Sequence, residues 1–223
     1  MTRAIAVLLL AASLATSCDS EATSAAVGLR VVACRPHPEL GSGALVRIAG
    51  VDEPLVLTAA HVVAGAEDIT VTHGDTTRTG TIVAFDPEMD LAYLAIDDGD
   101  GSPAWTIDSA AVTSGDTGVA LVVRDGVPVV VPVTIERRVT IRTEDIYVEG
   151  ETRRPGFELT ADIDEGDSGG AVVVDGTVVG VVWARSRRAG DRAYAIDPVR
   201  AGDRVHAQLR TGDLGDIDLA RCP

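Results

Sequence analysis

Short apolar runs separated by turn residues follow one another along almost the whole chain, and this pattern narrows the choice of fold. The runs are rich in valine and roughly four to eight residues long, which is typical of β-strands bounded by turns. The chain has 223 residues, of which 46% are hydrophobic, so it can bury a sizeable core. Only 3% are aromatic, so that core must consist of valine, isoleucine, leucine and alanine. The sequence therefore predicts an all-β protein.

The predicted strands fall into two halves. In the first half we expect strands at residues 29–34, 43–48, 55–58, 69–72, 79–85 and 91–96. The acidic, glycine-containing stretch 97–103 is typical of a linker. In the second half we expect strands at residues 118–124, 127–134, 138–142, 146–148, 157–159, 171–174, 178–184 and 193–196. Asp125-Gly126 and Asp175-Gly176 predict tight hairpin turns between strands.

One helix is expected near the end of the chain. Asp197 followed by Pro198 is a helix-start signal, and the pattern continues to about Arg210 before Gly212. This order of elements suits two closed, six-stranded antiparallel barrels followed by a helix. We place the first barrel at residues 28–110, and the second barrel with the helix at residues 111–223.

The first residues read as an export signal. A short positive start, an apolar run and a small-residue exit over residues 1–18 predict a signal peptide. The segment Leu14-Ala-Thr-Ser-Cys18 resembles a bacterial lipobox, in which Cys18 would carry a lipid anchor to the membrane. Residues 19–27 are small and polar and predict a tether. Two forms stay open: a periplasmic or cell-surface lipoprotein, or a protein cleaved near Ala25 or Ala26 and freely secreted.

Two further cysteines lie near the two ends of the predicted fold. If Cys18 is lipidated, Cys34 and Cys222 are the ones that remain. Exported proteins meet oxidising conditions, so this pair is expected to form a disulfide. The alternative is two separate buried thiols.

The charge of the chain bears on its partners. The formal net charge is −15, and the sequence contains no lysine. Such a chain repels phosphate backbones, which argues against a nucleic-acid partner. The sequence shows neither a metal-ligand spacing nor a phosphate-binding loop, so we predict no metal and no cofactor. It specifies no oligomeric state.

Three short segments carry the residue types that acyl transfer requires: Thr-Ala-Ala-His61, Asp90-Leu-Ala and Gly166-Asp-Ser168-Gly-Gly. A serine hydroxyl is a weak nucleophile, so a base such as imidazole must take its proton. A carboxylate must hold the imidazole in the right tautomer, and backbone N–H groups must stabilise the oxyanion. We therefore predict Ser168 as nucleophile, His61 as base, Asp90 as orienting carboxylate, and the N–H groups of Gly166 and Ser168 as the oxyanion hole.

These motifs resemble those of the trypsin-type serine proteases. His61 and Asp90 are only 29 residues apart, and this compact spacing is similar to the bacterial HtrA-like branch. The Gly41-Ser42-Gly43 segment ahead of the histidine is similar to that branch too, although no PDZ-like domain follows. Gly180–Ser186 and the terminal cysteine resemble actinobacterial periplasmic acid-resistance proteases. The resemblance implies a chymotrypsin-like fold and a serine endopeptidase that cleaves extracytoplasmic proteins or peptides.

The resemblance leaves two points open. No Ile-Val-Gly-Gly activation terminus is found, so the partner of Asp167 is unknown and activation by cleavage is in doubt. Asp162 occupies the position that forms the floor of the primary specificity pocket in trypsin-like enzymes, where aspartate implies a preference for arginine or lysine. Trp183 and Arg185 would lie on the pocket wall, where Arg185 could pair with Asp162. The alternative for Asp162 is a carboxylate in a surface turn.

Other readings compete with the protease. A protease fold can be kept as a catalytically silent binding module, but such relatives usually lose a triad residue and this chain keeps all three. Gly166-Asp-Ser168-Gly-Gly also matches the letters of an esterase elbow, but a valine-rich strand follows it where a helix is required. Asp86 is the near rival of Asp90. The remaining histidines, His37, His73 and His206, are predicted to be surface residues.

Overall fold

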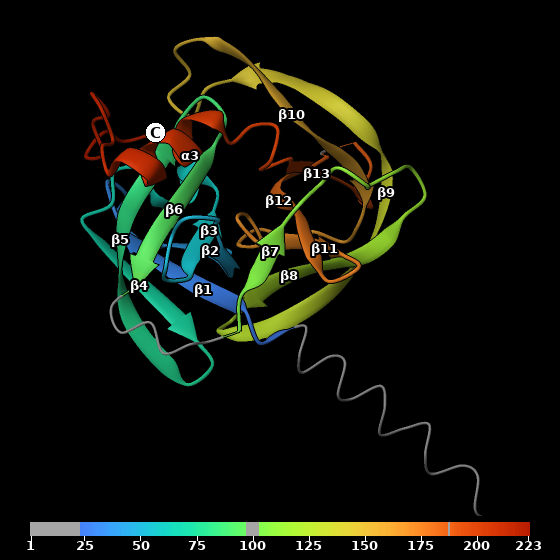
Figure 1. Ribbon diagram of the computed structural model, residues 1–223, viewed down its shortest axis with the longest axis horizontal. Helices are drawn as coiled ribbons and strands as arrows, with labels where there is room; N and C mark the ends of the chain where they lie inside the picture. Colours follow the sequence, from blue (N-terminus) through green and yellow to red (C-terminus); the bar gives the residue numbers. More distant parts are fainter. Residues whose placement is uncertain (1–22, 97–102, 187) are drawn as a thin grey trace, which may run out of the picture.

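The structure is a computed structural model that describes residues 23–96, 103–186 and 188–223. These residues form two β-barrels that lie side by side, with one helix against the first barrel (Figure 1). The predicted signal peptide, Cys18 and most of the predicted linker lie outside the described residues. Within the described part, no helix has both the length and the apolar character needed to span a bilayer.

The first barrel is a closed ring of six antiparallel strands. The strands are β1 (Ala26–Val32), β2 (Glu39–Arg47), β3 (Leu55–Thr58), β4 (Asp68–His73), β5 (Thr76–Asp86) and β6 (Leu91–Ile96). Their order is β1-β4-β5-β6-β3-β2, and pairing between β1 and β2 closes the ring. β1 begins earlier than expected, because Ala25, Ala26 and Val27, which the sequence placed in the tether, are fully buried in the first barrel.

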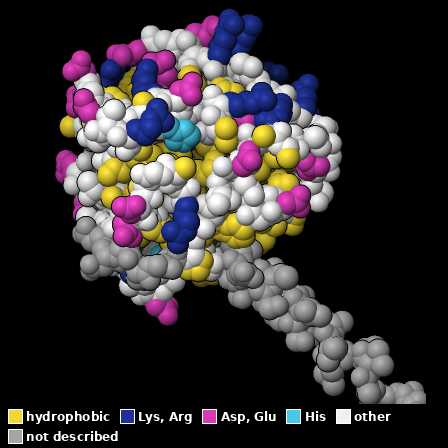
Figure 2. Space-filling model, in the orientation of Figure 1, with side chains coloured by type: hydrophobic (Ala, Val, Ile, Leu, Met, Phe, Trp, Pro, Cys, Tyr) yellow, Lys and Arg dark blue, Asp and Glu magenta, His cyan; other side chains and the backbone are white. Residues whose placement is uncertain are grey.

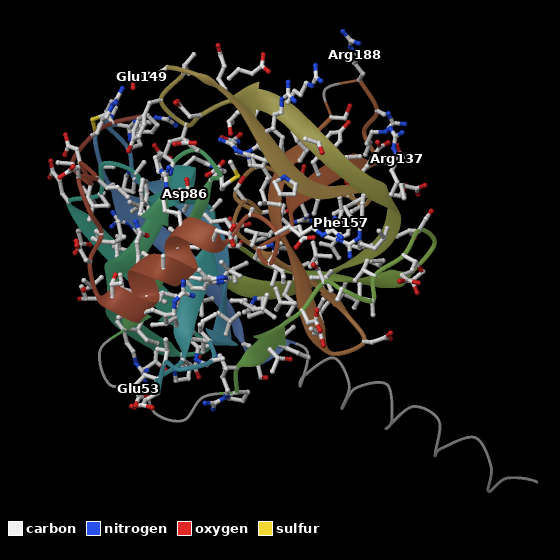
Figure 3. All side chains as sticks on the ribbon, turned by 45° about the horizontal axis from the view of Figure 1, so that its top comes forward. Glu53, Asp86, Arg137, Glu149, Phe157 and Arg188 are labelled. Carbon is white, nitrogen blue, oxygen red and sulfur yellow. A yellow bond between two sulfur atoms is a disulfide. The ribbon has the colours of Figure 1, made fainter. Side chains whose placement is uncertain are left out.

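The second barrel is also a closed ring of six antiparallel strands. These are β8 (Thr117–Arg124), β9 (Val127–Glu144), β10 (Glu151–Thr160), β11 (Ala171–Val174), β12 (Thr177–Arg185) and β13 (Arg192–Ile196). Their order is β11-β8-β9-β10-β13, and β12 pairs with both β11 and β13 to close the ring. Phe157 on β10 is fully buried inside this barrel (Figure 3). The predicted fold class, two six-stranded chymotrypsin-like barrels with a C-terminal helix, is confirmed.

A short strand that the sequence did not predict joins the barrels. β7 (Trp105–Ile107) pairs in parallel with β2 of the first barrel and with β12 of the second. It has three residues and one partly exposed face, so its sequence carries little periodicity. Its pairings make one continuous sheet through both barrels.

The two predicted hairpin turns are confirmed. Asp125-Gly126 joins β8 to β9 and Asp175-Gly176 joins β11 to β12. All four residues have positive φ, between 47° and 78°, as a two-residue turn of this kind requires. Between Asp125-Gly126 and the next turn, β9 runs for 18 residues as one strand where the sequence predicted two. Residues 146–148, predicted as a strand, lie in the turn between β9 and β10.

The helix α3 (Asp203–Thr211) begins later than the sequence predicted. Asp197 does act as a cap, because its Oδ1 accepts from the N–H groups of Val199 and Arg200, but the turn it stabilises ends before Gly202. α3 then packs on β5 and β6, and the amide of its Gln208 bonds both the N–H and the C=O of Phe85.

The end of the chain returns to the start of the first barrel. Cys34, just after β1, faces Cys222, and their Cα atoms are 5.9 Å apart, a spacing suited to a disulfide. Residues 35–40 follow Cys34 directly, so this contact lies beside the segment that will form one wall of the cleft described below.

Candidate active site

His61 lies on a single helical turn, α2 (Ala60–Val63), that directly follows β3. The apolar neighbours Ala60, Val62 and Val63 are buried in the core of the first barrel and anchor this turn. The imidazole itself is less buried, with 32% of the side chain exposed. The buried neighbours therefore fix the turn in the first barrel, while the imidazole of His61 reaches the surface.

Asp90 lies in the turn between β5 and β6 and reaches His61 with both carboxylate oxygens. Its Oδ1 accepts from the main-chain N–H of His61 at 2.8 Å, and its Oδ2 lies 2.9 Å from Nδ1 of the ring. Asp90 has a φ of +59°, a left-handed conformation that aspartate tolerates better than most residues. The carboxylate is 2% exposed, so it orients the imidazole from a site shielded from water.

The charges of this pair stabilise each other. Burial alone would lower the pKa of His61, but the charge of Asp90 and the hydrogen bond to it raise that pKa above its usual value of about 6.5. Burial alone would raise the pKa of Asp90, but His61 and then the nearby Arg154 hold it below its usual value. Asp90 is thus ionised at neutral pH and favours Nδ1 as the protonated nitrogen of His61, which leaves Nε2 available as a base.

Asp86, the rival of Asp90 in the sequence, has a different role. It is buried at the end of β5, near the start of α3 (Figure 3). Its Oδ1 accepts from the N–H groups of Glu88 and Met89 at 3.0 Å and lies 3.5 Å from Arg204. Asp86 therefore caps the turn that carries Asp90.

Ser168 lies in the tight turn before β11, between Gly166 and Gly169. Both glycines have positive φ, +92° and +87°. A Cβ on Gly169 would lie 2.2 Å from the backbone oxygen of Ser42, so only glycine permits the close approach of the two barrels here. Within the described residues, the N–H groups of Gly166 and Ser168 have no hydrogen-bond acceptor, as an oxyanion hole requires.

His61, Ser168 and Gly166 line one cleft of about 790 Å³ between the barrels. Its other walls come from residues 35–40 of the first barrel, and from Val123, Arg124, Asp125 and Glu165 of the second. No described hydrogen bond joins Ser168 Oγ to His61; such bonds are often long before substrate binds. The structure thus brings the three residues of the predicted triad to one site with the expected carboxylate–imidazole contact.

The comparison with known proteins decides the family. The model of the trypsin-like peptidase domain matches residues 41–181, which include His61, Asp90 and Ser168. The chain belongs to the trypsin-like peptidase family. The predicted resemblance to this family is therefore confirmed.

Several individual proteins are similar to this trypsin-like peptidase. Serine protease Rv3671c of Mycobacterium tuberculosis is 35% identical over 164 residues, which cover 73% of this chain and 39% of the relative. The active form of that protease has a TM-score of 0.78 over the whole of this chain at 24% identity, a likeness of fold. The HtrA-type protease AlgW S227A with a tripeptide has a TM-score of 0.72 at 27% identity and covers 87% of this chain and 63% of its own.

Ser42 connects this peptidase's two barrels behind the Ser168 turn. It is fully buried, and its Oγ donates to Gly166 O at 3.0 Å and accepts from Val123 N at 2.9 Å. Its backbone N–H donates to Ser168 O at 2.8 Å. Sequence reasoning noted the Gly41-Ser42-Gly43 segment but assigned Ser42 no role, because none of these three partners lies near it in the sequence. Ser42 fixes the peptides that carry Gly166 and Ser168.

We expect Ser42→Ala to lower kcat about fivefold and leave KM nearly unchanged, because losing the hydrogen bond to Gly166 O loosens the backbone at Gly166 by about 1 kcal/mol. The substitution also leaves the buried N–H of Val123 unpaired, so the free energy of unfolding should fall by about 1–3 kcal/mol. Steady-state kinetics on a peptide and urea unfolding measure the two effects. Ser114→Ala is the control, because its hydroxyl also donates to a carbonyl but on the surface. Unchanged kcat with lowered stability would leave Ser42 a purely structural residue.

The partner of Asp167, which the sequence left open, is Arg124 at the end of β8. Asp167 is fully buried, and Arg124 meets both of its oxygens, with Nε at 3.0 Å from Oδ1 and Nη2 at 2.6 Å from Oδ2. Nη2 also donates to Asp162 O at 2.9 Å. Asp167 Oδ2 accepts in addition from the N–H of Asp164. This bidentate pair holds the segment 162–168 that leads to Ser168.

The structure separates the three residues assigned to the specificity pocket. Asp162 is exposed and lines a hollow with Thr160 and Asp191, away from the cleft of His61 and Ser168. The pairing of Arg185 with Asp162 that the sequence allowed is not formed, because Arg185 Nη1 lies 3.1 Å from Asp164 Oδ1. Trp183 is half-buried and its ring lies under the guanidinium of a buried arginine, Arg154. The structure gives no support to a preference for arginine or lysine.

The other histidines lie outside this site, except that His37 lines the outer wall of the cleft. His73 and His206, which the sequence predicted as surface residues, are both half-buried, and Nε2 of His206 lies 3.3 Å from the hydroxyl of Tyr93. His206 belongs to α3 and lies on the side of that helix that meets Tyr93 of β6. Among the residues that the structure describes, no three His, Cys, Asp or Glu side chains are grouped so as to hold a metal ion.

Proposed function

We propose that this trypsin-like peptidase is a serine endopeptidase with Ser168 as nucleophile, His61 as general base and then acid, and Asp90 as the orienting carboxylate. One observation carries the proposal. Asp90 contacts His61 through both carboxylate oxygens, with Oδ1 at 2.8 Å from the main-chain nitrogen and Oδ2 at 2.9 Å from Nδ1, and His61 lines the same cleft as Ser168. The chain spans 39% of the length of the curated serine proteases that it matches, and the activity of those relatives supports this proposal.

In the proposed mechanism, Ser168 Oγ attacks the carbonyl carbon of a peptide bond while His61 Nε2 takes its proton. The carbonyl oxygen becomes an oxyanion that accepts hydrogen bonds from the N–H groups of Gly166 and Ser168. His61 then gives its proton to the leaving amine, and a water molecule repeats the sequence to free Ser168. Asp90 stays ionised throughout and stabilises the imidazolium.

The substrate class that we propose is an extended segment of protein or peptide. The cleft runs between the barrels and is open to solvent, so it accepts a chain that passes through it better than a small enclosed ligand. A similar HtrA-type protease was solved with a tripeptide, which supports this substrate class.

The test is digestion of one protein in folded and in unfolded, alkylated form, with mass spectrometry of the fragments and Ser168→Ala protein as control. Internal fragments that need Ser168 and form faster from the unfolded protein would support the proposal. Turnover of small esters with no cleavage of any polypeptide would instead identify an esterase. Absence of both would favour a catalytically silent binding module.

We also propose that no cleavage of the chain is needed to order the Ser168 turn. A buried carboxylate is costly unless it is paired, and here Arg124 of the same chain supplies the cation to Asp167. The charge is internal, so it is present as soon as the barrels fold. Arg124 thus fills the place of the Asp167 partner that the sequence analysis left open.

Arg124→Met is expected to lower kcat/KM about 100-fold, because it leaves the buried carboxylate of Asp167 without its cation and frees the Gly166 and Ser168 peptides to move. Arg185→Met is the control, since Arg185 pairs with Asp164 of the same turn but at the surface. Adding Asp167→Asn to Arg124→Met should recover part of the loss, because a neutral amide needs no cation. Steady-state kinetics measure these effects. Full activity in Arg124→Met alone would show that Arg124 is not needed to order the Ser168 turn.

Export of the chain is a further part of the proposal. The signal-like residues 1–18 and the lipobox-like Cys18 support an extracytoplasmic location, either lipid-anchored or secreted. The meeting of Cys34 and Cys222 supports a disulfide formed in an oxidising compartment. Such a bond would close a loop of 188 residues, which by loop-closure entropy would stabilise the fold by about 4–5 kcal/mol.

A further inference from the structure

Arg154 is the one arginine that the described structure buries almost completely. It lies on β10 and is 2% exposed, whereas its neighbour Arg153 is exposed. Basic side chains gather at the surface in the upper part of Figure 2, and Arg137 on β9 is among the exposed arginines, with 67% of its side chain accessible. Taking a guanidinium out of water is costly, and buried ion pairs are often neutral or unfavourable for stability. Its burial therefore calls for a reason other than stability.

The guanidinium of Arg154 is held by backbone carbonyls from both barrels. Its Nε donates to Glu88 O at 2.7 Å, and its Nη2 donates to Glu144 O at 3.2 Å. One face lies over the ring of Trp183, with 5.3 Å between the guanidinium carbon and the ring centroid. These contacts fix the plane and the direction of the group.

The remaining nitrogen points to the carboxylate that orients His61. Arg154 Nη1 lies 3.5 Å from Asp90 Oδ2, the oxygen that also meets His61 Nδ1. Arg154 belongs to the second barrel, whereas Asp90 and His61 belong to the first. The pair of His61 and Asp90 is therefore completed by a charge from the opposite barrel.

We propose that Arg154 is a positioning residue of the triad, which holds Asp90 ionised and aimed at His61 only when the second barrel is docked on the first. This inference rests on the proposed function, and it deepens it by adding a residue that no triad motif includes. Arg154 does not touch the cleft and acts through Asp90.

A consequence for the pH dependence of the enzyme follows. The charged groups that change the pKa of His61 are Asp90, then Arg154, then Glu39, from the largest effect to the smallest. Asp90 and Glu39 raise the pKa of His61, while Arg154 lowers it. The other charged or titratable side chains that line the same cleft are Arg35, His37, Arg124, Asp125 and Glu165. Removing the charge of Arg154 should raise the pKa of His61. The base is then protonated up to a higher pH, so the enzyme loses activity earlier as the pH falls.

The experiment compares Arg154→Gln, Arg154→Lys and Arg153→Gln with the wild type, by measuring kcat/KM for a peptide between pH 5 and 9. For Arg154→Gln we expect the acid limb to move up by about one pH unit and kcat at the optimum to fall about tenfold. Arg154→Lys keeps the positive charge but loses the planar guanidinium group. The acid limb of its pH profile should therefore stay at the wild-type position while kcat falls. Arg153→Gln makes the same change one residue away and should match the wild type.

Titration of the His61 imidazole by NMR gives a readout that does not need activity. An upward shift of the His61 pKa in Arg154→Gln, with no shift in Arg154→Lys, would support the inference even if the wild type cleaved no peptide. Coincident titration curves for wild type and folded Arg154→Gln would overturn it. If Arg154→Gln does not fold, Arg154→Lys is the test of the proposal. A wild-type kcat in Arg154→Lys would show that the guanidinium of Arg154 does not position Asp90.

Discussion

Ser168→Ala is expected to lower kcat about a million-fold while leaving the fold intact. The loss is large because alanine removes the atom that forms the acyl-enzyme. Folding should survive because the Ser168 side chain is only partly buried, whereas the turn around it is set by its backbone, Gly166, Gly169 and Ser42. Kinetics on a peptide and a thermal unfolding curve measure both parts.

The control for this variant is Ser114→Ala, which removes a surface hydroxyl of the same protein. It should keep wild-type kcat. Hydrolysis that persists at more than about one-hundredth of the wild-type rate in well-folded Ser168→Ala protein would show that another group is the nucleophile, and the triad would have to be reassigned.

Asp90→Asn is expected to lower kcat about 10,000-fold near neutral pH. An amide that donates to Nδ1 holds the imidazole in the wrong tautomer, so Nε2 carries the proton and cannot act as base. The geometry would change little, since Asn also tolerates the left-handed φ of +59° that Asp90 adopts. Steady-state kinetics and a circular dichroism spectrum are the measurements.

Asp86→Asn is the matched control, since Asp86 lies four residues earlier and is buried as well. It caps the turn that carries Asp90, so we expect lower stability and a rate within a few-fold of wild type. A large loss of rate in Asp86→Asn together with a small loss in Asp90→Asn would reverse the roles of the two carboxylates.

The sequence predicted well what is encoded locally. Asp125-Gly126 forms its hairpin because the two residues themselves adopt the positive φ that the turn needs. His61, Asp90 and Ser168 could be proposed as a triad because each lies in a short motif, and the three motifs in this order supply the residue types that acyl transfer requires. The barrels were predicted because valine-rich runs with frequent turns have few alternative architectures.

Contacts between distant strands could not be predicted. Arg154 looks like any arginine on a strand, and only the register of β10 against β9 and its approach to the β5–β6 turn place it at Asp90. Arg124 reaches Asp167 for the same kind of reason. Asp162 was matched by its position in the sequence, and its side chain lines a hollow with Thr160 and Asp191 that no feature of the sequence indicated.

The most direct test of the central claim is labelling of the purified protein with a fluorophosphonate probe, which reacts with a serine hydroxyl only when a base and an oxyanion hole activate it. The account predicts labelling of wild type at Ser168, located by mass spectrometry of the modified peptide, and none of Ser168→Ala. No labelling of folded wild-type protein, or labelling at another serine, would contradict the proposed triad.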